Sequence, residues 1–288
     1  MKHLVKRWLL HTVPMPYLWA KDAASRLHEP DVRGAILQWS GHTVVAGPFA
    51  GMQYVDQSTW GALTPKLVGS YERELHDVVR AVIDAPYRDI VVVGSAEGYY
   101  AVGLSRAMPG ATVHAYDTDE RARRTLLHLA TLNGTAGRTI IRQECTFDEL
   151  ERFAATTALV VCDIEGAELH LLDPDRAPSL GHYDIIVEIH DCIGASDVRQ
   201  ALTGRFQSSH ELTFIPFVPR GSDERAGLPW WFSRRARFLA LDEWRVPLRP
   251  DPGQALGLEW GVFRAKKRKG LTAPPPSRPS PGPDSTRD

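Results

Sequence analysis

The sequence predicts an α/β fold built on a doubly wound parallel sheet with helices on both faces. Short apolar runs alternate with segments whose apolar residues recur at three- and four-residue steps, and turn residues separate them. Such alternation is typical of parallel sheets with right-handed crossovers. A chain of 288 residues with 43% hydrophobic content can form one large domain with appendages.

The regular pattern begins near Tyr71. Leu75, Val79 and Val82 share one helical face, and Pro86 ends that helix. Two further helices are expected over Tyr99–Ala107 and Glu120–Leu132, and a weaker pattern covers Trp230–Leu241. The expected strands are, in chain order, Asp89–Val93, Ala111–Tyr116, Thr139–Gln143, Ala158–Cys162, Tyr183–Ile189, Glu211–Phe217 and Trp260–Ala265.

Composition excludes several classes of function. The formal net charge of -1 gives no electrostatic basis for binding nucleic acid or a membrane surface, so no nucleic-acid partner is expected. The basic and apolar N-terminus is interrupted by Pro14 and Pro16, and nothing approaches the roughly 18 apolar residues of a membrane span. Three cysteines without CxxC spacing (Cys145, Cys162, Cys192) favour a reducing cytoplasm.

Three parts of the chain are expected from these patterns. Residues 1–70 form an N-terminal extension that packs on the core, residues 71–265 form the main domain, and residues 266–288 form a basic, proline-rich, disordered tail. The tail begins with a run of basic residues at 266–269, which is more typical of a solvated linker than of a nucleic-acid site.

A glycine loop between the first strand and its helix indicates a ligand site. Gly94 and Gly98 lie where a helix N-terminus offers free amides, although many strand–helix turns contain two glycines for structural reasons. Asp117 ends the next strand, about twenty residues on, where an acid can bind a ribose diol. Asp117 or Asp119 could instead cap the following helix. Together, these features favour nucleoside binding.

The loop does not have the dinucleotide-binding form. Its sequence, GSAEG, lacks the G-x-G-x-x-G pattern, and Glu97 would place a negative charge beside a diphosphate. A ligand with a positive centre and no phosphate fits better. S-adenosylmethionine combines an adenosine, a sulfonium cation and an amino acid end.

These motifs together resemble class I S-adenosylmethionine-dependent methyltransferases, and more narrowly the FkbM-like group. DIEGAE followed by EIH is the most discriminating element. The matching stretches follow one another in the expected order: KLVGSYERE (66–74), VVVGSAEGYYAVGL (91–104), AYDTD (115–119), DIEGAELHLL (163–172) and IIVEIHD (185–191).

The resemblance implies a Rossmann-like sheet of seven strands with the last strand antiparallel. It also implies that Gly94, Ser95 and Gly98 line the amino acid end of the cofactor, that Asp117 binds its ribose, and that Gln143 and Glu144 lie near adenine. The sequence departs from the family at Val92, where an acidic residue is usual. Glu97 could compensate by holding the amino group of the methionine end.

Charged residues gather after two buried strands. Asp163 follows the strand over Ala158–Cys162, and Glu188 and His190 share one face of the next strand. The carboxyl ends of parallel strands meet at one edge of a sheet, and buried charge there requires a partner. Asp163 is also expected beside the methyl group of the cofactor. Glu165 and Glu168 are expected to begin the following helix, where acids complement the helix dipole, although Glu165 lies two residues past Asp163 and could face the pocket.

Three roles are open for Asp163, Glu188 and His190. His190 could be a general base towards an acceptor hydroxyl. The three side chains could instead hold a divalent metal that acidifies the acceptor. They could also form ion pairs that brace the loops. Cys162 and Cys192, which flank this cluster, are interpreted as small buried residues and not as nucleophiles.

The sequence therefore predicts a cytoplasmic methyltransferase that uses S-adenosylmethionine and acts on an oxygen of a small-molecule or sugar-like acceptor, with or without a divalent metal. One alternative is a non-catalytic nucleoside-binding or regulatory protein with the same fold, which the loss of the acid at Val92 favours. Another is a nicotinamide-dependent oxidoreductase, which the G-x-x-x-G loop disfavours.

Overall fold

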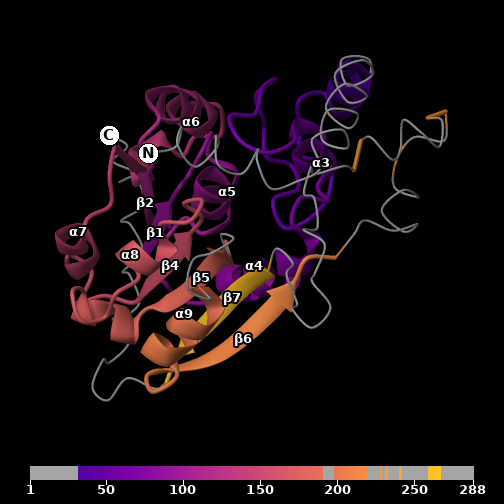
Figure 1. The fold of residues 1–288 in the computed structure, drawn as a ribbon. Coiled ribbons are helices and arrows are strands. Elements are labelled where there is room, and N and C mark those ends of the chain that lie inside the picture. Colours follow the sequence, from indigo (N-terminus) through magenta and orange to yellow (C-terminus); the bar gives the residue numbers. More distant parts are fainter. Residues whose placement is uncertain are drawn as a thin grey trace, which may run out of the picture.

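The computed structural model describes residues 32–190, 198–218, 228, 231–232, 240–241 and 259–266. Within them, one seven-stranded sheet has the order β3-β2-β1-β4-β5-β7-β6 (Figure 1). The neighbours from β3 to β5 are parallel, and β7 is antiparallel to both β5 and β6. The predicted fold class is confirmed. The strands are β1 (Asp89–Val93), β2 (Thr112–Tyr116), β3 (Thr139–Arg142), β4 (Ala158–Cys162), β5 (Asp184–Ile189), β6 (His210–Pro216) and β7 (Glu259–Ala265).

Alternation along the central strands creates two cores. Ile90 and Val92 of β1 pack into one core, and Val91 and Val93 pack into the other, because successive side chains of a strand point to opposite faces. The first face is covered by α4 (His76–Ile83), α5 (Tyr99–Ala107) and α6 (Glu120–Leu132). The second is covered by α7 (Phe147–Glu151), α8 (Glu168–Leu171) and α9 (Val198–Phe206).

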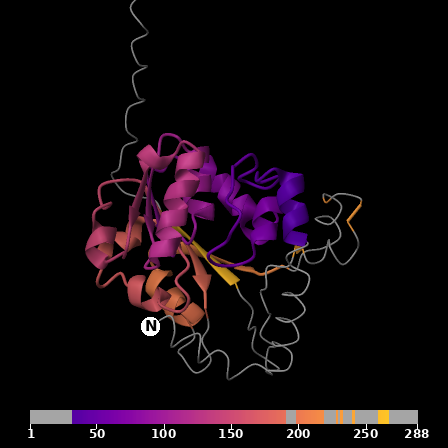
Figure 2. The same cartoon turned by 90° about the horizontal axis from the view of Figure 1, so that it is seen from above.

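Residues 32–70 pack beside α5 on the first face. They include a helical segment at 32–40 and the short helix α3 (Leu63–Val68), and Figure 2 shows them in indigo next to the α5 and α6 region. Ile36, Phe49 and Leu67 belong to the same core as the β1 side chains. Phe49 lies so close to α5 that a Cβ on Gly103 would be 2.6 Å from its ring. This packing brings residues 54–72 near the carboxyl ends of the central strands.

The observed boundaries differ little from the expected ones. The helix expected from Tyr71 begins at His76, after a 3₁₀ turn over Arg73–Leu75. Asn133 and Gly134 end α6 as expected, with Gly134 at φ +65°. No helix among the described residues is long and apolar enough to cross a membrane. Several expected features lie outside the described residues. They are residues 1–31, most of the expected helix near residues 230–241, Cys192 and the tail from residue 267.

Candidate functional site

A cavity opens at the carboxyl ends of β1 and β4. Four residues predicted from the sequence to contact a cofactor line it: Gly94, Ser95, Asp117 and Asp163. They come from the loops that follow three different strands, which the parallel sheet brings to one edge. The expected convergence of these four residues is therefore present in the fold.

Packing explains the two glycines of the loop after β1. Gly94 has φ +79°, and a Cβ there would lie 1.7 Å from the carbonyl oxygen of Asp163. Gly98 has φ +105°, and a Cβ there would lie 2.9 Å from the Leu126 side chain of α6. Both positions therefore require glycine before any ligand is considered. The backbone amides of Gly94 and Ser95 donate to the Tyr116 carbonyl of β2, at 2.9 and 3.0 Å, and hold the loop against that strand.

Asp117 links the glycine loop to the end of β2. Its Oδ2 accepts a hydrogen bond from the amide of Ala96, and its Oδ1 accepts one from the amide of Asp119, both at 2.8 Å. Asp119 is the N-cap of α6, because its side chain accepts from the amide of Arg121 at 2.8 Å. The sequence left the capping role open between the two acids. The structure assigns it to Asp119 and leaves Asp117 in the cavity wall.

Glu97 points into the protein. Its carboxylate is 0% exposed and lies 2.5 Å from the ammonium of Lys66. It also accepts hydrogen bonds from the Tyr54 hydroxyl at 2.8 Å, the Ser58 hydroxyl at 2.9 Å and the Thr59 amide at 2.9 Å. Burial alone would raise the pKa of Glu97, but Lys66 and these donors hold it below its usual value. A contact between Glu97 and a cofactor stays a prediction that this orientation does not support.

Gln143 and Glu144 are exposed residues that follow β3, and they are not among the residues that line the cavity. Their expected position near an adenine stays a prediction. Val92 does line the cavity, so this wall is apolar where an acidic residue was expected from the resemblance.

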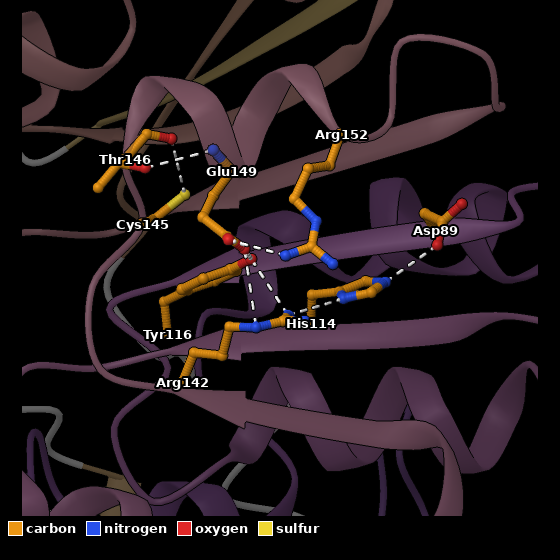
Figure 3. A network of polar contacts seen from close by, with 8 residues as sticks. All are labelled: Asp89, His114, Tyr116, Arg142, Cys145, Thr146, Glu149 and Arg152. Atoms are coloured by element: carbon orange, nitrogen blue, oxygen red, sulfur yellow. Dashed lines mark hydrogen bonds and ion pairs between the residues drawn. The ribbon is translucent and has the colours of Figure 1, made fainter.

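Arg142, the last residue of β3, takes part in a separate polar network on the second face of the sheet (Figure 3). The Tyr116 hydroxyl donates to Glu149 at 2.6 Å, and Arg152 donates to the other oxygen of Glu149 at 2.9 Å. Arg142 lies 3.2 Å from Nδ1 of His114. These contacts connect β2 and β3 to α7, and we interpret them as structural.

The acid and histidine cluster predicted at the ends of β4 and β5 is assembled in the fold. His190 Nδ1 lies 2.9 Å from Glu168 Oε1. Its Nε2 lies 3.6 Å from both Glu188 Oε2 and Glu165 Oε2, and 3.8 Å from Asp163 Oδ1. One imidazole is thus surrounded by four carboxylates. Asp163 and Glu165 also line the cavity, which connects the cluster to the cofactor region.

Glu168 does more than begin a helix. It is the first residue of α8, but its side chain is fully buried and accepts from the amides of Ile164 at 3.3 Å and Gly166 at 3.1 Å. With the bond to His190, it organises the loop after β4. Glu165 precedes α8, has φ +56° and is 50% exposed at its side chain.

The surrounding carboxylates keep His190 protonated. Burial alone would lower its pKa, but the hydrogen bond with Glu168 and the charges of Glu188 and Asp163 raise the pKa to about 10. The pKa of Glu168 is lowered in turn, because His190 and the Gly166 amide outweigh its burial. The raised pKa favours the imidazolium form of His190, whose positive charge offsets part of the negative charge of the cluster.

A cation could also occupy this cluster. Asp163, Glu165 and His190 each offer a ligand atom, and these atoms lie within 4.8 Å of one another. This group contains Glu165, whereas the set expected from the sequence contained Glu188. The roles of the cluster as base, metal site or brace stay predictions.

Several residues of the cavity were not predicted as site residues. Lys66, Glu72, Tyr100 and Trp260 line it from α3, the turn before α4, α5 and β7. The stretch KLVGSYERE, which supports the family resemblance, contains Lys66 and Glu72, and it was the available signal. Local patterns could not show that this stretch folds back onto the glycine loop.

No model of a known protein family matches the sequence, and neither does any curated protein. Among solved structures, the O-methyltransferase TomG from Streptomyces achromogenes, in complex with S-adenosylmethionine, is 15% identical, with 68% of this chain and 81% of that chain covered and a TM-score of 0.43. The O-methyltransferase from Bacillus cereus, in complex with S-adenosylhomocysteine, is 14% identical, with 84% and 97% covered and a TM-score of 0.39. An S-adenosylmethionine-dependent O-methyltransferase from Thermotoga maritima is 12% identical, with 69% and 67% covered and a TM-score of 0.39.

Proposed function

We propose that this chain is an S-adenosylmethionine-dependent methyltransferase that acts on an oxygen of a small-molecule or sugar-like acceptor. The observation that carries the proposal is the convergence of Gly94, Ser95, Asp117 and Asp163 on one cavity at the carboxyl edge of the sheet. The FkbM-like resemblance, a cytoplasmic location and the absence of a nucleic-acid partner are parts of this proposal. They rest on the sequence motifs, the cysteine pattern and the net charge.

The polar atoms of the cavity fit an adenosyl ligand with an amino acid end. Ser95 Oγ and Trp260 Nε1 are buried and have no hydrogen-bond partner among the described residues. A buried polar group without a partner costs about 1–3 kcal/mol, so a ligand that supplies acceptors there gains affinity. Asp117 presents a carboxylate in the cavity wall, and a ribose diol donates hydrogen bonds to such a group.

The bound cofactor would supply a methyl group on a sulfonium centre. Methyl transfer to a hydroxyl forms a C–O bond, breaks the C–S bond and releases the hydroxyl proton, so the chain must align the acceptor and take up that proton. Because the surrounding carboxylates raise the pKa of His190, we assign proton uptake to the carboxylate of Asp163, which lines the cavity. His190, at 3.8 Å from Asp163, then orients that carboxylate.

Isothermal titration with S-adenosylhomocysteine tests the proposal directly. We expect the wild-type chain to bind, and Asp117→Ala to weaken binding by about 10–100-fold, because a hydrogen bond to a charged group is lost. Asp119→Ala is the matched control: it removes the α6 cap, and its cofactor affinity should stay close to wild type.

Three results would count against the proposal. Absence of binding, or binding that Asp117→Ala leaves unchanged, would contradict a cofactor site at this edge. A higher affinity for NAD than for S-adenosylhomocysteine would favour an oxidoreductase. Full cofactor affinity without methylation of any small-molecule extract would favour a binding or regulatory protein.

A further inference from the structure

The indole of Trp260 is a buried hydrogen-bond donor three strands away from the glycine loop. Trp260 is 1% exposed and lines the cavity, and its Nε1 has no hydrogen-bond partner among the described residues. We propose that this indole donates a hydrogen bond to the methyl acceptor, and that the acceptor is a neutral, hydroxylated ring. The inference rests on the proposed function, which makes the cavity a site of methyl transfer.

The strand registers place Trp260 in a row of residues across the carboxyl edge of the sheet. Gly94, Asp163 and Glu188 each lie one position past the last registered pairs of β1, β4 and β5, so they are level with one another. Glu188 pairs directly with Trp260 of β7. Gly94, Asp163 and Trp260 all line the cavity. The row therefore runs from the glycine loop, past Asp163, to the indole.

The order of this row assigns Trp260 to the acceptor and not to the cofactor. Neighbouring strands are about 4.8 Å apart, so β7 lies roughly 14 Å from β1 and roughly 10 Å from β4. The methyl group is expected beside Asp163, and in-line transfer brings the acceptor from the side opposite the sulfur. That side lies over β5 and β7. Ser95, the other buried donor without a partner among the described residues, belongs to the glycine loop.

Packing holds the indole in place. Strand β7 pairs with β5 and β6, so Trp260 lies between Glu188 and Ile215. The ring of Tyr100 from α5 packs edge-on against the indole, with 6.3 Å between the ring centroids. A buried donor without a partner costs free energy, and a rigid site of this kind rejects ligands that leave the donor unpaired. The indole can therefore select an acceptor by its oxygen atoms.

Aromatic side chains make up much of the rest of the cavity lining. They are Trp60, Tyr71, Tyr99 and Tyr100, in addition to Trp260. Aromatic faces pack well against the C–H groups of a ring, and a few polar groups then fix the orientation of that ring. Because an indole N–H can only donate, the acceptor must supply an oxygen that accepts. A hydroxylated ring meets both conditions.

The charges of the cavity disfavour an anionic acceptor. Its acids within the described part of the chain are Glu72, Asp117, Asp163 and Glu165. Lys66 is the one lysine or arginine among the described lining residues, and it is paired with Glu97. Glu188 adds a carboxylate to the row, and His190 offsets part of this charge. A carboxylate or phosphate on the acceptor would be repelled here, whereas a neutral ring would not.

Transfer of label from tritiated S-adenosylmethionine to two matched sets of compounds tests the class of acceptor. One set contains neutral rings, namely methyl hexopyranosides, inositols and cyclohexanediols, and the other contains counterparts that carry a carboxylate. We expect the wild-type chain to label at least one neutral compound, and to label its acidic counterpart at least about tenfold more slowly. Preferential labelling of the acids would overturn the inference. So would the absence of label in the neutral set by a chain that binds S-adenosylhomocysteine. If S-adenosylhomocysteine does not bind, the proposed function fails instead.

Trp260→Phe tests the indole, because it keeps an aromatic ring and removes the donor. We expect kcat/KM for the labelled compound to fall by about 10–100-fold, and the affinity for S-adenosylhomocysteine in isothermal titration to change by less than roughly twofold. Trp39→Phe is the matched control, at a partly buried tryptophan of the same core that does not line the cavity. It should change neither quantity. Equal weakening of acceptor and cofactor, or an unchanged kcat/KM, would overturn the role of Trp260.

Single-deoxy analogues of the labelled compound separate a lost hydrogen bond from a change of shape. One analogue should react about 10–100-fold more slowly with the wild-type chain, and Trp260→Phe should use that analogue and the parent compound almost equally. Additive effects of the two changes would show that the indole does not contact the missing oxygen. A thermal scan checks that Trp260→Phe folds. Should it not fold, the wild-type series decides alone, and equal rates for all analogues would overturn the inference.

Discussion

Lys66 Nζ lies 2.5 Å from Glu97 Oε1, and the two side chains are 3% and 0% exposed. The pair joins α3 to the loop before α5, and so fastens the N-terminal segment to the edge of the sheet where the cavity opens. Two buried charges cost solvation energy, which their attraction and the hydrogen bonds from Tyr54 and Ser58 offset. The loss of one partner should therefore lower the stability of the fold more than the intact pair raises it.

Lys66→Met should lower the free energy of unfolding by about 3–5 kcal/mol, because it leaves the Glu97 carboxylate buried without its cation. The double variant Lys66→Met/Glu97→Gln should be destabilised by less than the sum of the two single variants, because it no longer buries an unpaired charge. Urea unfolding measures both. Additive effects would show that the two side chains do not interact energetically.

The contribution of Glu97 to stability should depend on pH. Its folded-state pKa lies below the ordinary value of 4.5. A lowered pKa stabilises the fold fully above the unfolded-state pKa and loses this effect as pH falls through the folded-state pKa. The stability difference between wild type and Glu97→Gln should therefore be constant above about pH 6 and shrink below about pH 4.5. A difference that grows on acidification would contradict the assignment.

Gly94→Ala should destabilise the fold by more than about 4 kcal/mol or prevent folding. The new Cβ would meet the Asp163 carbonyl oxygen at 1.7 Å, at a φ that disfavours alanine. Gly204→Ala is the control, because α9 leaves open space around that position. It should stabilise the fold by about 0.5–1 kcal/mol. Chemical denaturation distinguishes the two, and similar effects would contradict the close approach at Gly94.

Glu168→Gln and Glu165→Gln should differ strongly in stability. The buried Glu168 holds His190 and two loop amides, so its change should cost about 1.5–3 kcal/mol. The half-exposed Glu165 should change stability by less than about 0.5 kcal/mol. Thermal and urea unfolding of the two variants make the comparison. Equal effects would mean that Glu168 does not organise this loop.

Cys145 and Cys162 should be unreactive in the native chain. Both are buried, and burial followed by the charge of Glu149 raises the pKa of Cys145 to about 12, while burial and Glu168 raise that of Cys162. In a Cys192→Ser background, Ellman's reagent at pH 8 should give no rapid reaction until denaturant is added. A fast native reaction of either thiol would show that it is accessible as a thiolate.

Much of the fold could be predicted from local patterns in the sequence. The strands β1 and β4 and the helices α5 and α6 lie at the predicted residues, because strong apolar periodicity and glycine turns act over short stretches of chain. The cluster around His190 was also foreseen in part, since the carboxyl ends of parallel strands must meet at one edge. The strand over Trp260–Ala265 was expected from its apolar pattern, and only its antiparallel direction came from the family resemblance.

The partners of individual side chains could not be foreseen. Glu97 faces Lys66, which is 31 residues away in sequence, instead of the cavity. Asp119 caps the N-terminus of α6, whereas Asp117 lines the cavity. By itself, the sequence determined which segments are strands and helices and which edge carries the charges. Only the tertiary structure decided which charges neutralise one another and which face the cavity, because these contacts depend on how distant segments pack.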